Sequence, residues 1–189
     1  MNAINQLTDS ELILKVADLD SEAVQEIYDR YSPLIFTLIV KIVSDQKLAE
    51  EILTDVFLIV AKKGRKLNLS SNNVYTLLLT IARNKAVDVL RRQRNPEAVD
   101  EYNDEYEDRY ILPRLADGIK PVNLDDVLND KEKIVAAIDS MTDAQKYVLE
   151  LAYYEGLTEK EIAKKLNIPF QTIRSKIQIA LGNLKNKLK

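Results

Sequence analysis

The first 94 residues contain four runs in which apolar side chains recur three and four positions apart. This spacing places the side chains on one face of an α-helix, because the helix turns once every 3.6 residues. The clearest run carries Ile27, Tyr31, Ile35 and Ile39 along one face. We therefore predict helices over residues 8–17, 21–43, 46–62 and 73–94, with the polar stretch 65–73 as a loop.

The last sixty residues show the same spacing in shorter runs, which predict helices over 130–140, 143–154, 158–166 and 170–188. Thr158 and Glu161 have the T-x-x-E spacing of a capping box, in which each residue satisfies a backbone N–H of the other at a helix start. Asn167, Ile168 and Pro169 separate the last two helices. Two helices joined by such a short turn predict a helix-turn-helix.

Residues 95–130 have no sustained apolar period and hold most of the acidic excess. Residues 95–133 contain 12 acidic and 5 basic side chains, whereas residues 1–94 and 134–189 are mildly basic. A connection of this length is unusual inside one compact domain. We therefore predict an all-α protein of two small helical domains, 1–94 and 131–189, joined by an acidic, flexible linker over 95–130.

Histidine, cysteine and tryptophan are absent from the whole chain. Their absence excludes zinc sites with imidazole or thiolate ligands, disulfides, and nucleophile systems built on Ser-His-Asp or Cys-His. Carboxylates can hold Mg²⁺, but Glu50, Glu51 and Asp55 have no convincing second carboxylate pair. We expect no catalytic residue, no metal site, no cofactor and no enzymatic activity.

The longest apolar stretch, residues 34–43, is interrupted by Lys41 and is far shorter than the roughly 20 residues of a membrane span. Residues 1–10 have neither the positive start nor the apolar stretch of a signal peptide. We therefore expect a cytoplasmic protein without a membrane span.

The last predicted helix has an apolar stripe that includes Ile173, Ile177 and Leu184, and a polar face opposite it. Side chains on the polar face and its flanks can reach phosphate oxygens and base edges in a major groove; they are Gln171, Thr172, Arg174, Ser175, Lys176, Gln178 and the apolar Ile179. An ordinary solvated face of a helical bundle has the same pattern. This chemistry alone therefore does not decide between a DNA-binding face and a solvated one.

A second basic region runs from Lys62 to Arg94, with nine basic residues and a single acidic one, Asp88. A protein of net charge −3 can bind nucleic acid through such a local face, because salt screens charges beyond about 10 Å. A basic run is also commonly only a solvated face, and Asp88 can simply pair with Arg91 or Arg92.

The C-terminal segment MTDAQKYVLELAYYEGLTEKEIAKKLNIPFQTIRSKIQIALGNLK resembles the C-terminal domain of bacterial RNA polymerase sigma factors of the extracytoplasmic-function (ECF) group. The matching positions are Val148, Leu149, Glu155, Gly156, Leu157, Thr158, Glu161, Ile162, Ala163, Leu166, Ile168, Pro169, Thr172, Ile173, Arg174, Ser175 and Ala180. Three N-terminal segments resemble the same family in the right order: IYDRYSPLIFTL, LAEEILTDVFLIVAKK and TIARNKAVDVLRRQRN.

The resemblance implies a role for each part of the chain. Residues 1–94 would be sigma region 2, which binds core RNA polymerase and the minus-ten promoter element, and residues 131–189 would be region 4, which reads the minus-thirty-five element. The implied core-polymerase contacts are Glu50, Glu51, Asp55 and Phe57. The implied minus-ten contacts are Lys62, Lys63, Arg65, Asn68, Ser70, Ser71, Asn72, Arg83, Asn84, Lys85, Asp88, Arg91 and Arg92. The implied minus-thirty-five contacts are Lys160, Gln171, Thr172, Arg174, Ser175, Lys176, Gln178 and Ile179.

The resemblance further implies that core RNA polymerase, promoter DNA and an anti-sigma protein are partners, and the apolar Ile179 is a candidate contact for the last. The chain departs from the family where tryptophan commonly ends the acidic helix and precedes the Ile-Ala-Arg-Asn motif; Val74 and Tyr75 stand at the second place. The alternative is a stand-alone helix-turn-helix regulator that uses only the C-terminal domain.

Overall fold

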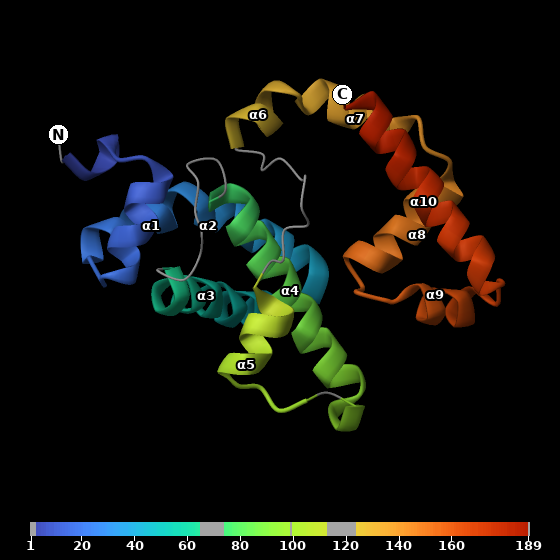
Figure 1. Cartoon of the computed structure of the whole chain (residues 1–189), viewed down its shortest axis with the longest axis horizontal. Helices are drawn as coiled ribbons and strands as arrows, with labels where there is room; N and C mark the ends of the chain where they lie inside the picture. Colours follow the sequence, from blue (N-terminus) through green and yellow to red (C-terminus); the bar gives the residue numbers. More distant parts are fainter. Residues whose placement is uncertain (1–2, 65–73, 99, 113–123, 189) are drawn as a thin grey trace. The chain divides into compact units, whose positions relative to one another are not determined.

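The computed structural model describes residues 3–64, 74–98, 100–112 and 124–188, and every regular element in these ranges is helical. The chain divides into two compact units, Met1–Leu124 and Asp125–Lys189, and each is described by itself (Figure 1). The predicted all-α class with two helical domains is confirmed. None of the helices in the described ranges is long and apolar enough to cross a membrane.

The first unit is built around its second helix, which packs against the other three long helices. Its elements are η1 (Ala3–Gln6), α1 (Asp9–Ala17), α2 (Ser21–Val43), α3 (Gln46–Lys63) and α4 (Val74–Arg94). These bounds agree with the predicted ranges to within about two residues. The apolar stripes meet in a core of fully buried side chains that includes Leu12, Ile27, Ile35, Ile52, Leu78 and Ile81.

Side chains fix where the first three long helices begin. Thr8 and Glu11 form a capping box at α1, and the hydrogen bond from the Thr8 side chain lowers the pKa of Glu11. Asp20 accepts from the backbone N–H groups of Glu22 and Ala23 at the start of α2. Asp45 accepts from the N–H of Leu48 at 2.9 Å and starts α3. These caps satisfy N–H groups that the helices leave unpaired.

Gly64 ends α3 with helical backbone angles (φ −51°). A Cβ at this position would lie 3.1 Å from the Cβ of Ala17, which is closer than most side-chain contacts. Glycine therefore serves here to let the end of α3 lie against the end of α1. The conformational freedom of glycine is not what this position requires.

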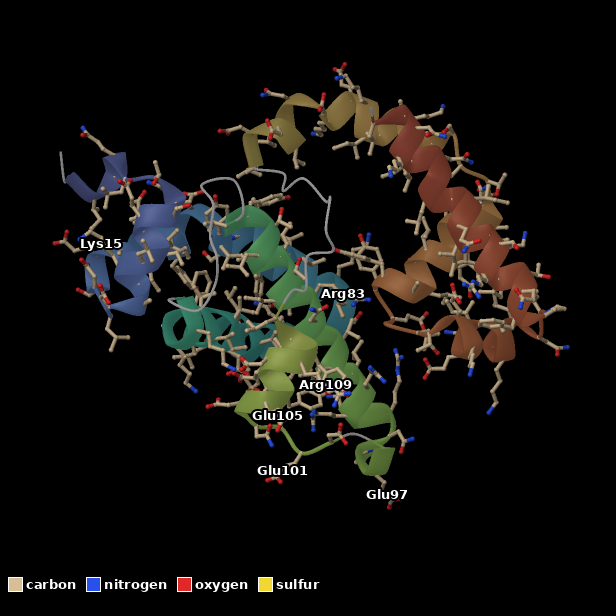
Figure 2. All side chains as sticks on the ribbon, viewed as in Figure 1. Lys15, Arg83, Glu97, Glu101, Glu105 and Arg109 are labelled. Atoms are coloured by element: carbon tan, nitrogen blue, oxygen red, sulfur yellow. The ribbon has the colours of Figure 1, made fainter. Side chains whose placement is uncertain are left out.

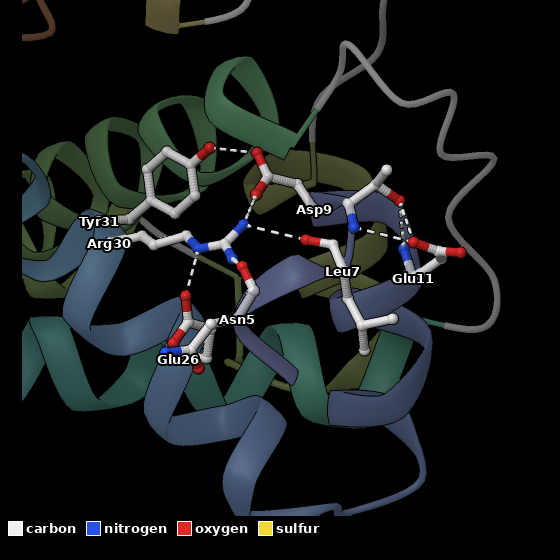
Figure 3. A network of polar contacts seen from close by, with 8 residues as sticks. Asn5, Leu7, Asp9, Glu11, Glu26, Arg30 and Tyr31 are labelled. Carbon is white, nitrogen blue, oxygen red and sulfur yellow. Dashed lines mark hydrogen bonds and ion pairs between the residues drawn. The ribbon is translucent and has the colours of Figure 1, made fainter. Parts of the chain in front are cut away.

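A polar network holds the N-terminal segment against α2 (Figure 3). The Arg30 guanidinium donates to the carboxylates of Glu26 and Asp9 at 2.7 Å and to the carbonyls of Asn5 and Leu7 at 3.3 Å. The hydroxyl of Tyr31 donates to the other oxygen of Asp9. Burial alone would lower the pKa of Arg30, but the two carboxylates outweigh it and raise that pKa.

The second unit contains the helix-turn-helix. Its elements are α6 (Leu124–Asn129), α7 (Lys131–Asp139), α8 (Asp143–Tyr153), α9 (Glu159–Leu166) and α10 (Phe170–Lys187), of which α6 begins at the boundary and was not predicted. Its core is a cluster of Val148, Leu151, Ile162 and Ile173. The predicted capping box of Thr158 and Glu161 is confirmed, with the Thr158 N–H donating to Glu161 at 2.7 Å.

The structure differs from the prediction in the first part of the expected linker. Three short helical elements occur there: η3 (Pro96–Ala98), α5 (Asp104–Tyr106) and η4 (Glu107–Ile111), the last a single π-helical turn. The side chain of Ile111 is fully buried, and η4 packs against α4. The first unit therefore extends beyond residue 94. Residues 113–123 of the predicted linker lie outside the described residues.

Candidate nucleic-acid interface

The polar face of α10 is open to solvent, as the helix-turn-helix prediction requires. Ile173 and Ala180 are buried on its inner side, while Lys176 is half-buried. The outer side carries an apolar exception, Ile179, which is 55% exposed. The predicted side chains that are exposed here are Gln171, Thr172, Arg174, Ser175 and Gln178, and Lys160 is exposed on α9.

The turn between α9 and α10 depends on Asn167. Its φ of 52° lies in the left-handed region, and its N–H bonds back to the carbonyls of Ala163 and Lys164. Asparagine tolerates this conformation better than most residues other than glycine. The N–H of Ile168 also bonds to the Ala163 carbonyl at 3.0 Å. This geometry redirects the chain so that α10 starts at Phe170.

The basic residues of α3 and α4 are arranged differently, because residues 102–111 lie along these helices. We call this segment, Tyr102–Ile111, the acidic strap. It contains two aspartates and two glutamates, with Arg109 as its single basic residue. In Figure 2, Glu105 and Arg109 mark its course beside α4.

Lys63, at the end of α3, is 4% exposed. Its ammonium group lies 2.5 Å from the carboxylate of Asp108 and 3.3 Å from that of Glu107. It also donates to the Asp104 carbonyl at 3.0 Å. Burial alone would lower the pKa of Lys63, but the two carboxylates outweigh it and raise that pKa. The ammonium group is thus held by three groups of the strap.

Lys85, on α4, is also covered. Its ammonium lies 3.0 Å from the carboxylate of Asp55 on α3 and 3.9 Å from the centre of the Tyr102 ring. A cation over an aromatic face is attracted by the ring's negative π-surface. Lys85 is therefore held from one side by α3 and from the other by the strap.

Asp88 joins α4 to the strap through one carboxylate oxygen and pairs with Arg92 of its own helix through the other. One accepts from the hydroxyl of Tyr106 at 2.5 Å, and the other accepts from Nε of Arg92 at 2.8 Å. Asp88 is buried, so its charge depends on these two donors. One turn earlier, the Asn84 amide donates to the Ile111 carbonyl at 3.0 Å.

Three tyrosines of the strap pack against one another with tilted rings. The ring centres of Tyr102 and Tyr106 are 5.6 Å apart, and those of Tyr106 and Tyr110 are 4.6 Å apart. The Arg92 guanidinium lies 4.6 Å from the Tyr106 ring centre. Burial and then the carboxylate of Glu107 raise the pKa of Tyr102, and burial and then Asp88 raise that of Tyr106.

The predicted minus-ten residues therefore fall into three groups. Lys62 and Arg91 are exposed, and Arg83 is half-buried. The strap or α3 contacts five others, namely Lys63, Asn84, Lys85, Asp88 and Arg92. The rest lie outside the described residues: Arg65, Asn68, Ser70, Ser71 and Asn72.

Lys63 and Lys85, which the resemblance implies as minus-ten contacts, are therefore buried under other groups in this structure. Sequence reasoning also missed the strap residues Tyr102, Tyr106 and Glu107. The sequence around them offers one local signal for the tyrosines. Tyrosines 102, 106 and 110 are four residues apart, which is the spacing of side chains on one face of a helix.

The expected contacts with polymerase lie on α3. Glu50 and Glu51 are exposed, and Asp55 is partly exposed beside Lys85. The structure does not support Phe57 as a surface contact, because it is 8% exposed and its ring centre lies 5.1 Å from that of Tyr28. The exposed apolar residue of this helix is its neighbour, Leu58, which is 52% exposed.

Two family models match this chain: "Sigma-70 region 2" over residues 27–95 and "Sigma-70, region 4" over residues 137–186. The two matches fall on the helices that carry the basic residues and on the helix-turn-helix. Within the described residues, no group of three or more acidic residues is placed to hold a metal ion. The chain is thus a helix-turn-helix protein with the two conserved domains of sigma-70 proteins.

Comparison with individual relatives shows which group of sigma-70 proteins the chain resembles. The chain is 30% identical over 177 residues to "ECF RNA polymerase sigma factor SigK" of Mycolicibacterium vanbaalenii. The aligned region covers 94% of this chain and 87% of the relative. It is 29% identical over 182 residues to the SigK of Mycobacterium sp. (strain JLS), covering 96% and 91%. The chain belongs to the ECF RNA polymerase sigma factors.

A solved structure of Rhodobacter sphaeroides SigE in complex with the anti-sigma ChrR is similar over 95% of this chain and 97% of that chain. The sequence identity is 25% and the TM-score is 0.46.

Proposed function

We propose that this protein binds core RNA polymerase and directs transcription from promoters whose minus-ten and minus-thirty-five elements it recognises. The observation that carries the proposal is the presence in one chain of both sigma-70 regions. Sigma factors regulate initiation without catalysing a reaction themselves, and the catalytic chemistry belongs to the polymerase.

The second unit is assigned to the minus-thirty-five element. A recognition helix enters the major groove with its N-terminal residues toward the base edges. On α10 those residues are Gln171, Thr172, Arg174 and Ser175, all of them exposed. Arginine can bond both acceptors of guanine in the major groove, and glutamine can pair with adenine. Lys176 and Lys160 are placed on the flanks, where they contribute phosphate contacts.

The first unit is assigned to the minus-ten element and to the polymerase. Lys62 and Arg91 supply exposed positive charge at the ends of α3 and α4. The exposed face of α3, with Glu50, Glu51 and Leu58, is assigned to the coiled coil of the polymerase's largest subunit. This face of α3 combines one apolar side chain with carboxylates, and such a composition suits a partner helix that also carries polar side chains.

Promoter-specific transcription tests the proposal directly. The full chain is added to core polymerase on genomic fragments, and run-off products and start sites are mapped. Reproducible start sites that depend on the chain are the expected result. Failure to co-purify with core polymerase, together with specific binding to duplex DNA by the chain alone, would instead establish the stand-alone regulator.

A matched pair of variants tests the role of α10. Arg174→Ala is expected to reduce specific run-off product about tenfold or more, since a lost bidentate base contact costs about 1–3 kcal/mol. Lys185→Ala removes an exposed positive charge near the other end of the same helix and should leave specific product within about twofold. Equal losses in the two variants would refute the assignment of the recognition helix.

An anti-sigma partner is the remaining part of the proposal. The exposed Ile179 sits among polar side chains on α10, and an isolated β-branched residue there is suited to an apolar pocket of a partner. Ile179→Asp should weaken inhibition by that partner. Unchanged inhibition and unchanged promoter activity would leave Ile179 an ordinary surface residue.

A further inference from the structure

We propose that the acidic strap occupies a binding surface for single-stranded DNA on the first unit and that the DNA displaces the strap from the basic side chains that it covers. The inference rests on the proposed function, because it deepens the account of the minus-ten surface. It concerns three cations that are covered in the structure: Lys63, Lys85 and Arg92.

The first argument is the position of these cations. Lys63 is at the end of α3, while Lys85 and Arg92 are on α4, so the strap lies across both helices that carry the exposed Lys62 and Arg91. The covered and exposed cations thus belong to the same two helices. With the strap displaced, Lys63, Lys85 and Arg92 would be uncovered beside Lys62 and Arg91, while Lys85 and Arg92 would keep their pairs with Asp55 and Asp88.

The second argument is the chemistry of the strap. Single-strand surfaces combine cations that follow the phosphate backbone with planar groups on which bases stack. The strap provides groups that match both: carboxylates at Lys63 and the Tyr106 ring against Arg92. It satisfies the surface with the same kinds of group that a nucleic-acid strand carries.

The third argument is that part of this contact is accessible to solvent. The side chain of Asp108 is 48% exposed and that of Arg92 is 28% exposed. The helical pieces of the strap are only three and five residues long. Lys63 is itself buried beside Glu107, so the exposed Asp108 is the carboxylate of this group for which a polyanion can compete first.

Two variants with the same change in net charge separate this mechanism from general repulsion. Glu107→Gln with Asp108→Asn removes the two carboxylates that hold Lys63. Glu101→Gln with Glu105→Gln also removes two negative charges from this acidic stretch, but both side chains are exposed and lie away from α4 (Figure 2). The second pair is the matched control.

Binding is measured on the full chain with a fluorescein-labelled oligothymidylate of about 10 nucleotides, within the site size of one single-strand module. The Glu107/Asp108 variant should bind about three to ten times more tightly than the unmodified chain. Its plot of log affinity against log salt should be steeper by about 0.7, the value for one additional phosphate contact. The control variant should change affinity by less than about twofold.

A second measurement uses the unmodified chain and therefore does not depend on the folding of a variant. The N–H of Glu107 bonds to the Asn103 carbonyl, and the N–H of Leu112 bonds to the Glu107 carbonyl. Saturation with the oligonucleotide should speed hydrogen exchange at both amides. Unchanged or slower exchange would overturn the proposal, as would equal affinities of the two variants or no binding by any of the chains.

The outcomes are separable from those for the proposed function. A chain that supports promoter-specific transcription but keeps its strap in place on DNA retains the proposed function and refutes this inference. A chain that releases the strap on the oligonucleotide but supports no transcription with core polymerase refutes the proposed function alone.

Discussion

Tyr106 donates its hydroxyl proton to the buried carboxylate of Asp88, 18 residues earlier in the chain, at 2.5 Å. The second oxygen of Asp88 accepts from Arg92, whose guanidinium also lies against the Tyr106 ring. The three side chains form a closed set in which each contacts the other two. The strap and α4 are therefore joined by a neutralised charge as well as by apolar contact.

Tyr106→Phe should lower the free energy of unfolding by about 1.5–3 kcal/mol, because it removes one of two donors to a buried carboxylate while keeping the ring. Urea denaturation followed by circular dichroism measures the change. Tyr110→Phe is the control, since Tyr110 is 42% exposed, and it should change stability by less than about 0.5 kcal/mol. Equal effects would show that the hydroxyl of Tyr106 does not stabilise the strap.

Arg30→Met should release the N-terminal segment from α2. The substitution keeps much of the side-chain volume but removes the donors to Asp9, Glu26 and two carbonyls. A loss of about 2–3 kcal/mol is expected, with faster proteolysis in the first eight residues.

Lys15→Met is the comparison for Arg30→Met, because Lys15 forms an exposed ion pair with Asp20. Such pairs contribute about 0–1 kcal/mol. A Lys15 variant as unstable as the Arg30 variant would contradict the assignment of Arg30 as the anchor.

Asn167→Val should destabilise the second unit by about 1–2 kcal/mol, because a β-branched side chain is strained at the positive φ of this turn. Asn167→Gly should be close to neutral, since glycine adopts that conformation without a Cβ clash. Thermal melting of the full chain measures both. Asn183→Val, on the exposed surface of α10, controls for the side-chain change alone.

The strap should also loosen at alkaline pH. Folding raises the pKa values of Lys63, Tyr102 and Tyr106. A group with a raised folded pKa contributes stability that is complete below its unfolded pKa and lost as the pH rises through the folded value. The unfolded values are about 10 for tyrosine and lysine, so the strap should be intact at neutral pH and destabilised above about pH 10.

Tyrosine absorbance measures this transition cleanly, because the chain has nine tyrosines and no tryptophan. Tyr102→Phe should remove part of the last tyrosinate signal to appear. Tyr147→Phe removes an exposed ring on α8 and controls for the loss of one tyrosine from the total absorbance change. If Tyr102→Phe instead removes signal from the early part of the titration, the burial of Tyr102 does not govern its ionisation.

The long helices and the helix-turn-helix could be predicted because their evidence is local. Apolar residues three and four positions apart define a buried face, as for Ile35 and Ile39 on α2, and Thr158 with Glu161 marks a helix start within four residues. The exposed polar face of α10 follows from the same periodicity. Each of these inferences needs only residues that are close together in the sequence.

The strap could not be predicted in this way, because its stability depends on distant partners. From the sequence alone, Glu107 and Asp108 look like solvated acids. Their partner, Lys63, is more than forty residues earlier and is brought against them only by the fold. Lysine is rarely buried unless it is paired, so its burial could not be read from the sequence around it. Phe57 shows a different limit. It lies four residues after Leu53, on the buried stripe of α3, and only the family resemblance implied a polymerase contact there.

The contact between Gly64 and Ala17 links the N-terminal helix to the chemistry of the basic surface. A methyl group at position 64 would meet Ala17 at 3.1 Å and push the end of α3 away from α1. Lys63 would move with that end, and its distances to Glu107 and Asp108 would change. Substitutions in α1, far along the chain from any proposed DNA contact, can therefore alter how strongly the protein holds its own acidic segment.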